Sequence, residues 1–203
     1  SHTEVVCCVI EGDWTVLSGN DASLSIFNKK NTSPMIVRTY RNSIVCIAVS
    51  EKFDQVVAGT KDHTLLFCSL SRGVITSIYE LSKEITPQRI LITESLGFVL
   101  VNGTKSVNGE LHHVIMLFNI NGSLMRQLDV QYDIACWSSW VNPGGFDYVI
   151  VADTKGTLLF AEAFYIDNGL YICYECQTPI IGVEYLRGST SIVAVGENGT
   201  VFF

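Results

Sequence analysis

The stretch AGTKDHTLLF runs from Ala58 to Phe67, and a near copy, ADTKGTLLF, runs from Ala152 to Phe160. In each stretch an apolar run ends in Gly or Asp, a polar turn follows, and a Thr starts a second apolar run. Arms rich in β-branched and aromatic residues around a group of turn formers are typical of a β-hairpin. The near-repetition also indicates a supersecondary unit that occurs more than once in this chain of 203 residues.

The strand that follows the turn recurs at a nearly constant interval. Its equivalent positions are Ile26, Phe67, Leu117, Phe160 and Phe203. The intervals between them are 41, 50, 43 and 43 residues. The longest interval contains an insertion, NGTKSVNGELHH, between Val101 and Val114. Without this insertion the period is about 43 residues, so the chain contains five copies of one unit.

Each copy can be divided into short strands. The inner strands are VVCCVI, IVCIAV, QRILIT, IACWSS and IIGVEYL, a second strand precedes each turn, and the first four copies add an outer strand. Four short strands every 40 to 45 residues or so, separated by Gly, Asn and Asp, are the sequence form of a β-propeller blade. We therefore predict an all-β fold, a β-propeller of four-stranded antiparallel blades. The predicted blades are residues 1–42, 43–84, 85–132, 133–178 and, incomplete, 179–203.

The copies resemble WD repeats. In LSGNDASLSIFN, Gly19 and Asp21 match the turn of that pattern, and Phe27 stands where Trp is usual. Every Trp-Asp pair of the pattern is degenerate in this sequence. His2 occupies the place of the family's His, and the resemblance implies that it hydrogen-bonds the turn carboxylate of Asp21.

Acidic residues recur at the turns of successive copies, among them Asp21, Asp62 and Asp153. Enzymic propellers gather acids and His around a central channel to hold a metal. A residue that recurs once per repeat at a turn is instead typical of one that ties its own turn. We therefore predict structural roles for these three carboxylates.

Two stretches carry a closer resemblance, Ser43–Ile78 and LFNINGSLMRQLDV at Leu117–Val130. Both are similar to the C-terminal propeller of BEACH-domain proteins, the neurobeachin relatives, and SRGVITSI carries that family's Arg-x-Gly turn at Arg72 and Gly73. The resemblance implies a pleckstrin-like domain, a BEACH domain and two further blades before Ser1, completing a seven-bladed ring. It also implies a cytoplasmic scaffold for protein partners in vesicle and membrane traffic, peripheral on vesicle or organelle membranes through the rest of the protein.

Two other functions stay open. The chain can be a WD-repeat subunit of another multiprotein complex, which is also an interaction scaffold. The alternative of a different class is an enzymic propeller whose metal site is completed by missing blades. The sequence contains no nucleophile–base pair, complete ligand cluster or Gly-rich phosphate loop, so we predict a non-enzyme without a cofactor or metal.

The composition restricts the partners. Apolar residues make up 48% of the chain and charged residues 16%, and the mean hydropathy is +0.32. No apolar run approaches the roughly 18 residues of a membrane span, and no basic amphipathic segment suits a membrane surface. A formal net charge of −7 argues against nucleic acid, because phosphate contacts require a basic face. We therefore expect protein partners and no direct membrane insertion.

The cysteines do not indicate a metal site. Their number, seven, is odd, and most lie in apolar runs, which is typical of reduced, buried thiols. CYEC, from Cys173 to Cys176, has ligand spacing, but no second pair or nearby His completes a tetrahedral set. His112 and His113 are adjacent on an extended segment and diverge, so we expect a solvated loop there.

Two connections are candidate partner-binding surfaces. The insertion from Gly103 to His112 joins the second and third strands of its blade and presents Lys105 together with His112 and His113. The segment Ser138–Tyr148 joins the first and second strands of the next blade. Its Trp140 and Phe146 are candidate exposed anchors, because aromatic side chains dominate interface hot spots. Folding of both rings back over the core is the alternative.

The two terminal units have apolar surface to cover. The first offers Val6, Cys8 and Ile10 to whatever precedes it, and the last has no outer strand to cover Thr200–Phe203. A blade buries its two faces only against neighbours. We therefore expect missing blades or a second chain next to Val5 and Phe203.

Overall fold

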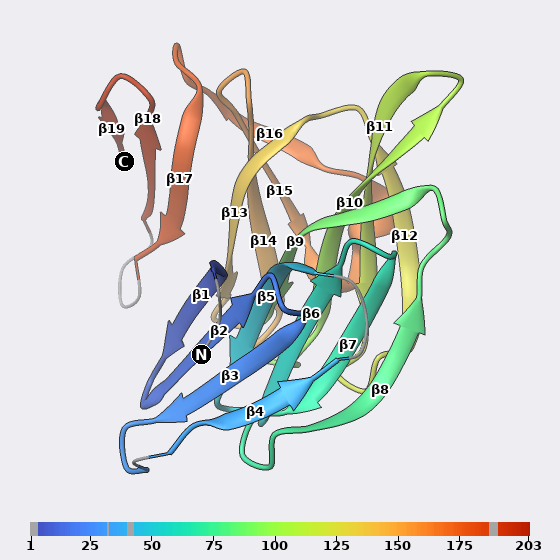
Figure 1. Ribbon diagram of the computed structural model, residues 1–203. Helices are drawn as coiled ribbons and strands as arrows, with labels where there is room; N and C mark the ends of the chain where they lie inside the picture. The colour runs from blue at the N-terminus through green and yellow to red at the C-terminus, as the bar shows by residue number, and fades with distance from the viewer. Residues whose placement is uncertain (1–3, 32, 40–42, 187–190) are drawn as a thin grey trace.

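The structure, a computed structural model, describes residues 4–31, 33–39, 43–186 and 191–203. The described residues form five antiparallel sheets, each built from strands that are consecutive in the sequence. Figure 1 shows the sheets following one another in chain order, from the first in blue to the fifth in red. The predicted all-β fold is confirmed.

The first four sheets contain four strands each and the fifth contains three. The first contains β1 (Val5–Glu11), β2 (Trp14–Gly19), β3 (Ser23–Asn28) and β4 (Met35–Arg38). The second contains β5 (Ile44–Ser50), β6 (Gln55–Thr60), β7 (Thr64–Ser69) and β8 (Val74–Glu80). The third contains β9 (Ile85–Ile92), β10 (Val99–Val107), β11 (Glu110–Phe118) and β12 (Leu124–Val130). The fourth contains β13 (Ile134–Val141), β14 (Asp147–Asp153), β15 (Thr157–Glu162) and β16 (Tyr171–Glu175). The fifth contains β17 (Ile180–Tyr185), β18 (Ile192–Gly196) and β19 (Val201–Phe202).

The first strands of successive sheets pack against one another. β1 contacts β5, β5 contacts β9, β9 contacts β13, and β13 contacts β17. Sheets that stand side by side along a line of inner strands are the blades of a β-propeller. No comparable packing joins β1 to β17 in the part of the chain that the structure describes, so the five blades form a partial propeller (Figure 1).

Each blade has two apolar faces, because successive side chains of a strand point to opposite sides of the sheet. In the second blade, Val57 and Phe67 face the third blade, whereas Val56 and Leu66 face the first. Every residue of β6 and β7 is therefore buried, as in other sheets covered on both sides. Four buried clusters result, one between each pair of neighbouring blades.

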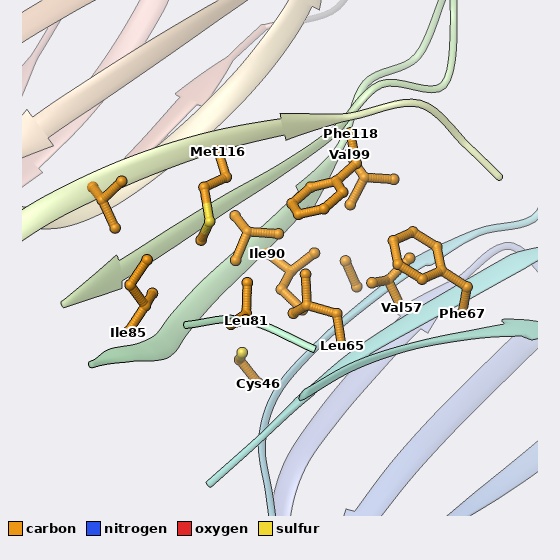
Figure 2. Close-up of a cluster of buried hydrophobic side chains, with 13 residues drawn as sticks. Cys46, Val57, Leu65, Phe67, Leu81, Ile85, Ile90, Val99, Met116 and Phe118 are labelled. Carbon is orange, nitrogen blue, oxygen red and sulfur yellow. The ribbon is translucent and has the colours of Figure 1, made fainter. Parts of the chain in front are cut away.

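The cluster between the second and third blades is drawn in Figure 2. Phe67 and Phe118 are fully buried, with ring centroids 6.2 Å apart, and the ring of Tyr79 meets Phe118 edge-on at 4.9 Å. The two sheets approach closely at Gly59, where a Cβ atom would lie 2.9 Å from the Cβ of Pro87. A larger residue at position 59 would push the blades apart.

Four of the five equivalent positions predicted from the sequence lie on third strands. They are Ile26 on β3, Phe67 on β7, Leu117 on β11 and Phe160 on β15. The fifth, Phe203, lies one residue beyond the end of β19. The terminal apolar positions of the first blade are exposed as expected, since Ile10 keeps 68% of its surface and Val6 46%.

A short 3-10 helix, η1 (Ala163–Asn168), lies between β15 and β16 and was not predicted from the sequence. It is fastened to the third blade by Arg126, which donates a hydrogen bond to the Asp167 carboxylate at 2.7 Å. The same guanidinium lies 4.6 Å from the ring centroid of Phe164. Within the described ranges, no helix has the length and hydrophobicity needed to cross a bilayer.

Candidate binding surfaces

Asp153 ties the turn between β14 and β15. Its Oδ1 atom accepts hydrogen bonds from the backbone amides of Lys155 at 2.9 Å and Thr157 at 2.7 Å. The side chain is 3% exposed, and these two bonds supply the partners that a buried carboxylate requires.

Asp62 and Asp21 occupy the matching turns of the second and first blades. Asp62 accepts a hydrogen bond from the Thr60 hydroxyl, and Asp21 accepts one from the Ser23 hydroxyl at 2.9 Å. The predicted partner of Asp21, His2, lies outside the described residues. Asp153, Asp62 and Asp21 therefore each bond a residue of their own turn, as predicted.

The insertion in the third blade is not a solvated loop. β10 and β11 pair without a break from Val99 opposite Phe118 to Val107 opposite Glu110, so the inserted residues lengthen the hairpin. The two turn residues, Asn108 and Gly109, have φ values of 52° and 84°, the positive φ pair that a two-residue hairpin turn needs. The sequence contained this signal, because Asn-Gly between two apolar arms favours a tight hairpin rather than a loop.

Lys105 and His112 stand opposite each other on the lengthened hairpin. The Lys105 ammonium lies 2.8 Å from both carboxylate oxygens of Asp129 on the neighbouring β12. His112 is half-exposed, with Nε2 4.0 Å from the Glu110 carboxylate. The tip beyond them leaves Leu111 66% exposed, so this hairpin presents a mixed apolar and charged surface.

His113 points to the other side of the hairpin, toward the fourth blade. Its Nε2 atom lies 3.4 Å from the Asp133 carboxylate, and its buried Nδ1 atom has no hydrogen-bond partner among the described residues. His112 and His113 therefore diverge, as predicted for neighbours on an extended strand.

Trp140 lies on β13 and not in an exposed loop. Its ring stacks between those of Tyr148, at 5.2 Å, and Tyr185 of the fifth blade, at 5.7 Å. Because β13 extends further than the sequence suggested, this Trp joins the cluster between the fourth and fifth blades. The prediction of a free anchor was wrong for Trp140, and the alternative of packing over the core holds.

Phe146 occupies the turn between β13 and β14 and is 53% exposed. Its backbone amide donates to the Asn142 side-chain oxygen at 2.9 Å, and Gly145 takes a positive φ of 82°. The turn is therefore ordered by its own contacts and holds an aromatic ring toward solvent.

Asp147, the next residue, was missed by the sequence analysis. It is 2% exposed and accepts hydrogen bonds from the Thr93 hydroxyl at 2.7 Å and from the amides of Ser95 and Leu96, both at 2.8 Å. These donors belong to the β9–β10 turn of the third blade. The carboxylate thus locks together the turns of two blades, and its partners are about fifty residues away, beyond the reach of local patterns.

His63 also has a role that its position in a turn did not indicate. It has a positive φ of 63°, and its Nδ1 atom lies 2.8 Å from the carbonyl oxygen of Ile85 at the start of the third blade. The imidazole therefore connects the second blade to the third.

A cavity of about 1010 Å³ lies at one end of the inner strands, where the turns between first and second strands meet. Its polar lining includes Glu11, Glu51, Lys52, Glu94 and Glu184. Successive turns of an antiparallel sheet lie at opposite ends, so the lengthened β10–β11 hairpin is on the other face of the propeller.

The described residues contain no group of three or more His, Cys, Asp or Glu side chains that could hold a metal. All seven cysteines are free. Burial raises the pKa of the Cys46 and Cys68 thiols to about 12, which keeps them protonated and unreactive near neutral pH.

The sequence matches no family model and no curated protein. Solved structures do match. The computationally designed Ika8 protein superposes with a TM-score of 0.73 and 14% identity, over 99% of this chain and 59% of that chain. BBS1N in complex with ARL6DN, soaked with mercury, superposes with a TM-score of 0.72 and 15% sequence identity, over 96% of this chain and 62% of that chain.

These likenesses establish a β-propeller fold, and at such identities they establish the fold alone. The chain spans about three fifths of the length of the solved chains that it resembles. Membership of the WD-repeat or BEACH-domain families is not part of what they show.

Proposed function

We propose that this partial propeller is a non-catalytic scaffold that binds protein partners. The observation that carries the proposal is that several of its polar side chains hold turns and blades together. Asp153, Asp147 and His63 each tie turns or blades together. What the blades present to solvent is a set of rigid turns with apolar and charged side chains, which suits recognition.

The finer proposal is that the chain is the C-terminal propeller region of a BEACH-type protein in membrane traffic. It rests on the resemblance of Ser43–Ile78 and Leu117–Val130, and it places the protein in the cytoplasm, peripheral to vesicle or organelle membranes. A solved neighbour of the fold, BBS1N, is in complex with ARL6DN, which supports protein binding as a use of such a propeller. A WD-repeat subunit of another complex remains the second candidate for the same surface chemistry.

Lysine cross-linking of the intact protein in cells, followed by mass spectrometry, tests the scaffold proposal. We expect cross-links from the propeller to other proteins, and the lysines report the face, since Lys52 lies by the cavity and Lys105 on the opposite hairpin. Propeller lysines that cross-link only within their own chain would count against a scaffold. The same mass spectra identify the intact protein that carries this propeller. A BEACH domain in that protein supports the finer proposal, and its absence supports the second candidate.

A further inference from the structure

The structure assigns a partner-binding role to one face of the propeller, an inference that rests on the proposed scaffold function. We name the turn face as the three linked turns Glu51–Asp54, Thr93–Phe98 and Asn142–Asp147, at the mouth of the cavity. We propose that it docks a protein whose contact surface combines apolar side chains with Lys or Arg.

Two apolar side chains project from the turn face. Leu96 is 55% exposed and Phe146 is 53% exposed, each at the tip of its own turn. Each offers apolar area that a protein partner can remove from water, which is favourable for association. Neither is among the residues that line the cavity of about 1010 Å³, which favours a protein surface over a small molecule as the partner.

The two turns that carry these side chains are bonded to each other. The buried Asp147 carboxylate binds the amide of Leu96 itself at 2.8 Å, and the Ser95 hydroxyl donates to the Gly145 carbonyl oxygen at 2.8 Å. Leu96 and Phe146 therefore belong to two turns that are bonded to each other across a blade boundary. A turn that is already ordered loses less conformational entropy when a partner binds, which favours affinity.

The turn Glu51–Asp54 of the second blade extends the same surface. The Lys52 ammonium donates to the carbonyl oxygens of Glu94, at 2.6 Å, and Ser95, at 3.2 Å. The ring of Phe53 packs on Gly97, where a Cβ atom would lie 3.0 Å from it. Three neighbouring blades thus share one continuous, cross-connected ridge of turns.

The charge beside this ridge is negative. Glu11, Glu51, Glu94 and Glu184 line the adjoining cavity, and these four carboxylates outnumber the single lysine of the lining, Lys52. The chain as a whole has a formal net charge of −7. Complementarity therefore calls for a cationic partner surface, whose approach the negative field accelerates.

The test uses two synthetic amphipathic helical peptides of about 15 residues with the same Leu face, one with Lys and one with Glu on the polar face. We measure their affinity for the intact protein by fluorescence anisotropy. We expect the Lys peptide to bind more tightly, and the paired substitution Leu96→Ser and Phe146→Ser to weaken it about tenfold. Both positions are exposed, so the variant keeps its unfolding midpoint.

Leu111→Ser, at the hairpin tip on the opposite face, is the matched control and leaves the affinity unchanged. Glu51→Gln with Glu94→Gln reduces both the affinity and its dependence on salt. Equal affinity for the two peptides, no binding of the Lys peptide, or an equal loss in Leu111→Ser overturns the inference. In the cross-linking experiment, partner cross-links at Lys105 but not at Lys52 would place the partner on the opposite face. That result overturns the inference and leaves the scaffold function intact.

Discussion

Tyr79 and Tyr174 occupy the same place in two blades, on the outer strand opposite Leu65 and Leu158 respectively. Tyr79 is half-buried, because Phe118 of the next blade lies against its ring at 4.9 Å. Tyr174 is 55% exposed, and the ring of Phe202 stays 6.4 Å away. The same residue type in the same register packs against a buried cluster in one blade and is exposed in the other. The neighbouring blade, and not the strand itself, decides which.

The difference extends to the whole of each cluster. Between the second and third blades, Phe67 and Phe118 are fully buried. Between the fourth and fifth, the buried side chains are smaller, such as Ile150 and Ile180, the large rings of Trp140 and Phe202 are only partly buried, and β19 contributes only two strand residues. Because stability in a repeat fold is a sum over blades and their interfaces, it should decline from the second blade toward the fifth.

The largest expected effect is that of Phe118→Ala. Removal of a fully buried ring should cost about 3–5 kcal/mol of unfolding free energy, since the transfer and cavity terms add. Phe202→Ala, in the less covered interface, should cost less than half as much. Urea denaturation of both variants checks this, and equal losses would show that the two interfaces are equivalent.

Asp147→Ala tests the hydrogen bonds between the fourth blade and the third. It leaves three donors in the third blade without a partner, so we expect a loss of about 2–4 kcal/mol. The exposed Asp133→Ala is the control and should cost under about 1 kcal/mol. Hydrogen exchange at the amides of Ser95 and Leu96 should accelerate in Asp147→Ala alone. Unchanged protection of these amides contradicts the proposed lock.

Tyr79→Ala and Tyr174→Ala sharpen the comparison at equivalent positions. We expect about 1–2 kcal/mol for Tyr79, which loses both apolar burial and an edge-on ring contact, and about 0.5 kcal/mol or less for Tyr174. Thermal unfolding of the two variants shows which substitution lowers stability more. A larger effect at Tyr174 would mean that the fifth blade covers it in solution.

The smallest effect concerns a carboxylate of the second blade. Burial raises the pKa of Asp54, but hydrogen bonds from the hydroxyl of Ser69 and from Ser71 outweigh it, so the pKa lies below its ordinary value of about 4. A depressed pKa means stability that is present above about pH 4 and lost as the pH falls through the folded value. Asp54→Asn should therefore be less stable than the parent near neutral pH. The gap should close in acid, as urea titrations at several pH values can show.

The sequence could predict the blades because their signals are local. Hairpin turns, apolar strands and the period of about 43 residues all lie within one repeat. The exposure of Phe146 agrees with its prediction as an anchor, whereas Trp140 in the same segment is packed, so the Pro-Gly turn alone did not decide between the two alternatives. The insertion was located correctly, but its Asn108–Gly109 turn was not recognised as the end of a longer hairpin.

The rest depends on contacts between blades. Trp140 stacks on Tyr185, and Asp147 bonds a turn about fifty residues earlier, so neither position reveals its partner locally. The short helix η1 is fastened by Arg126 of the preceding blade, and its six residues are too few for a helical period to appear in the sequence. Tertiary partners, not local propensity, determine these features.

That every sheet consists of consecutive strands also has a kinetic consequence. Strand pairing never waits for a distant part of the chain, so each blade can close its hairpins in the order in which it is synthesised. At about 5–20 residues per second, the ribosome releases one blade every few seconds. Each new blade can then pack on the apolar face of its predecessor, so we expect assembly by stepwise growth from the N-terminal side.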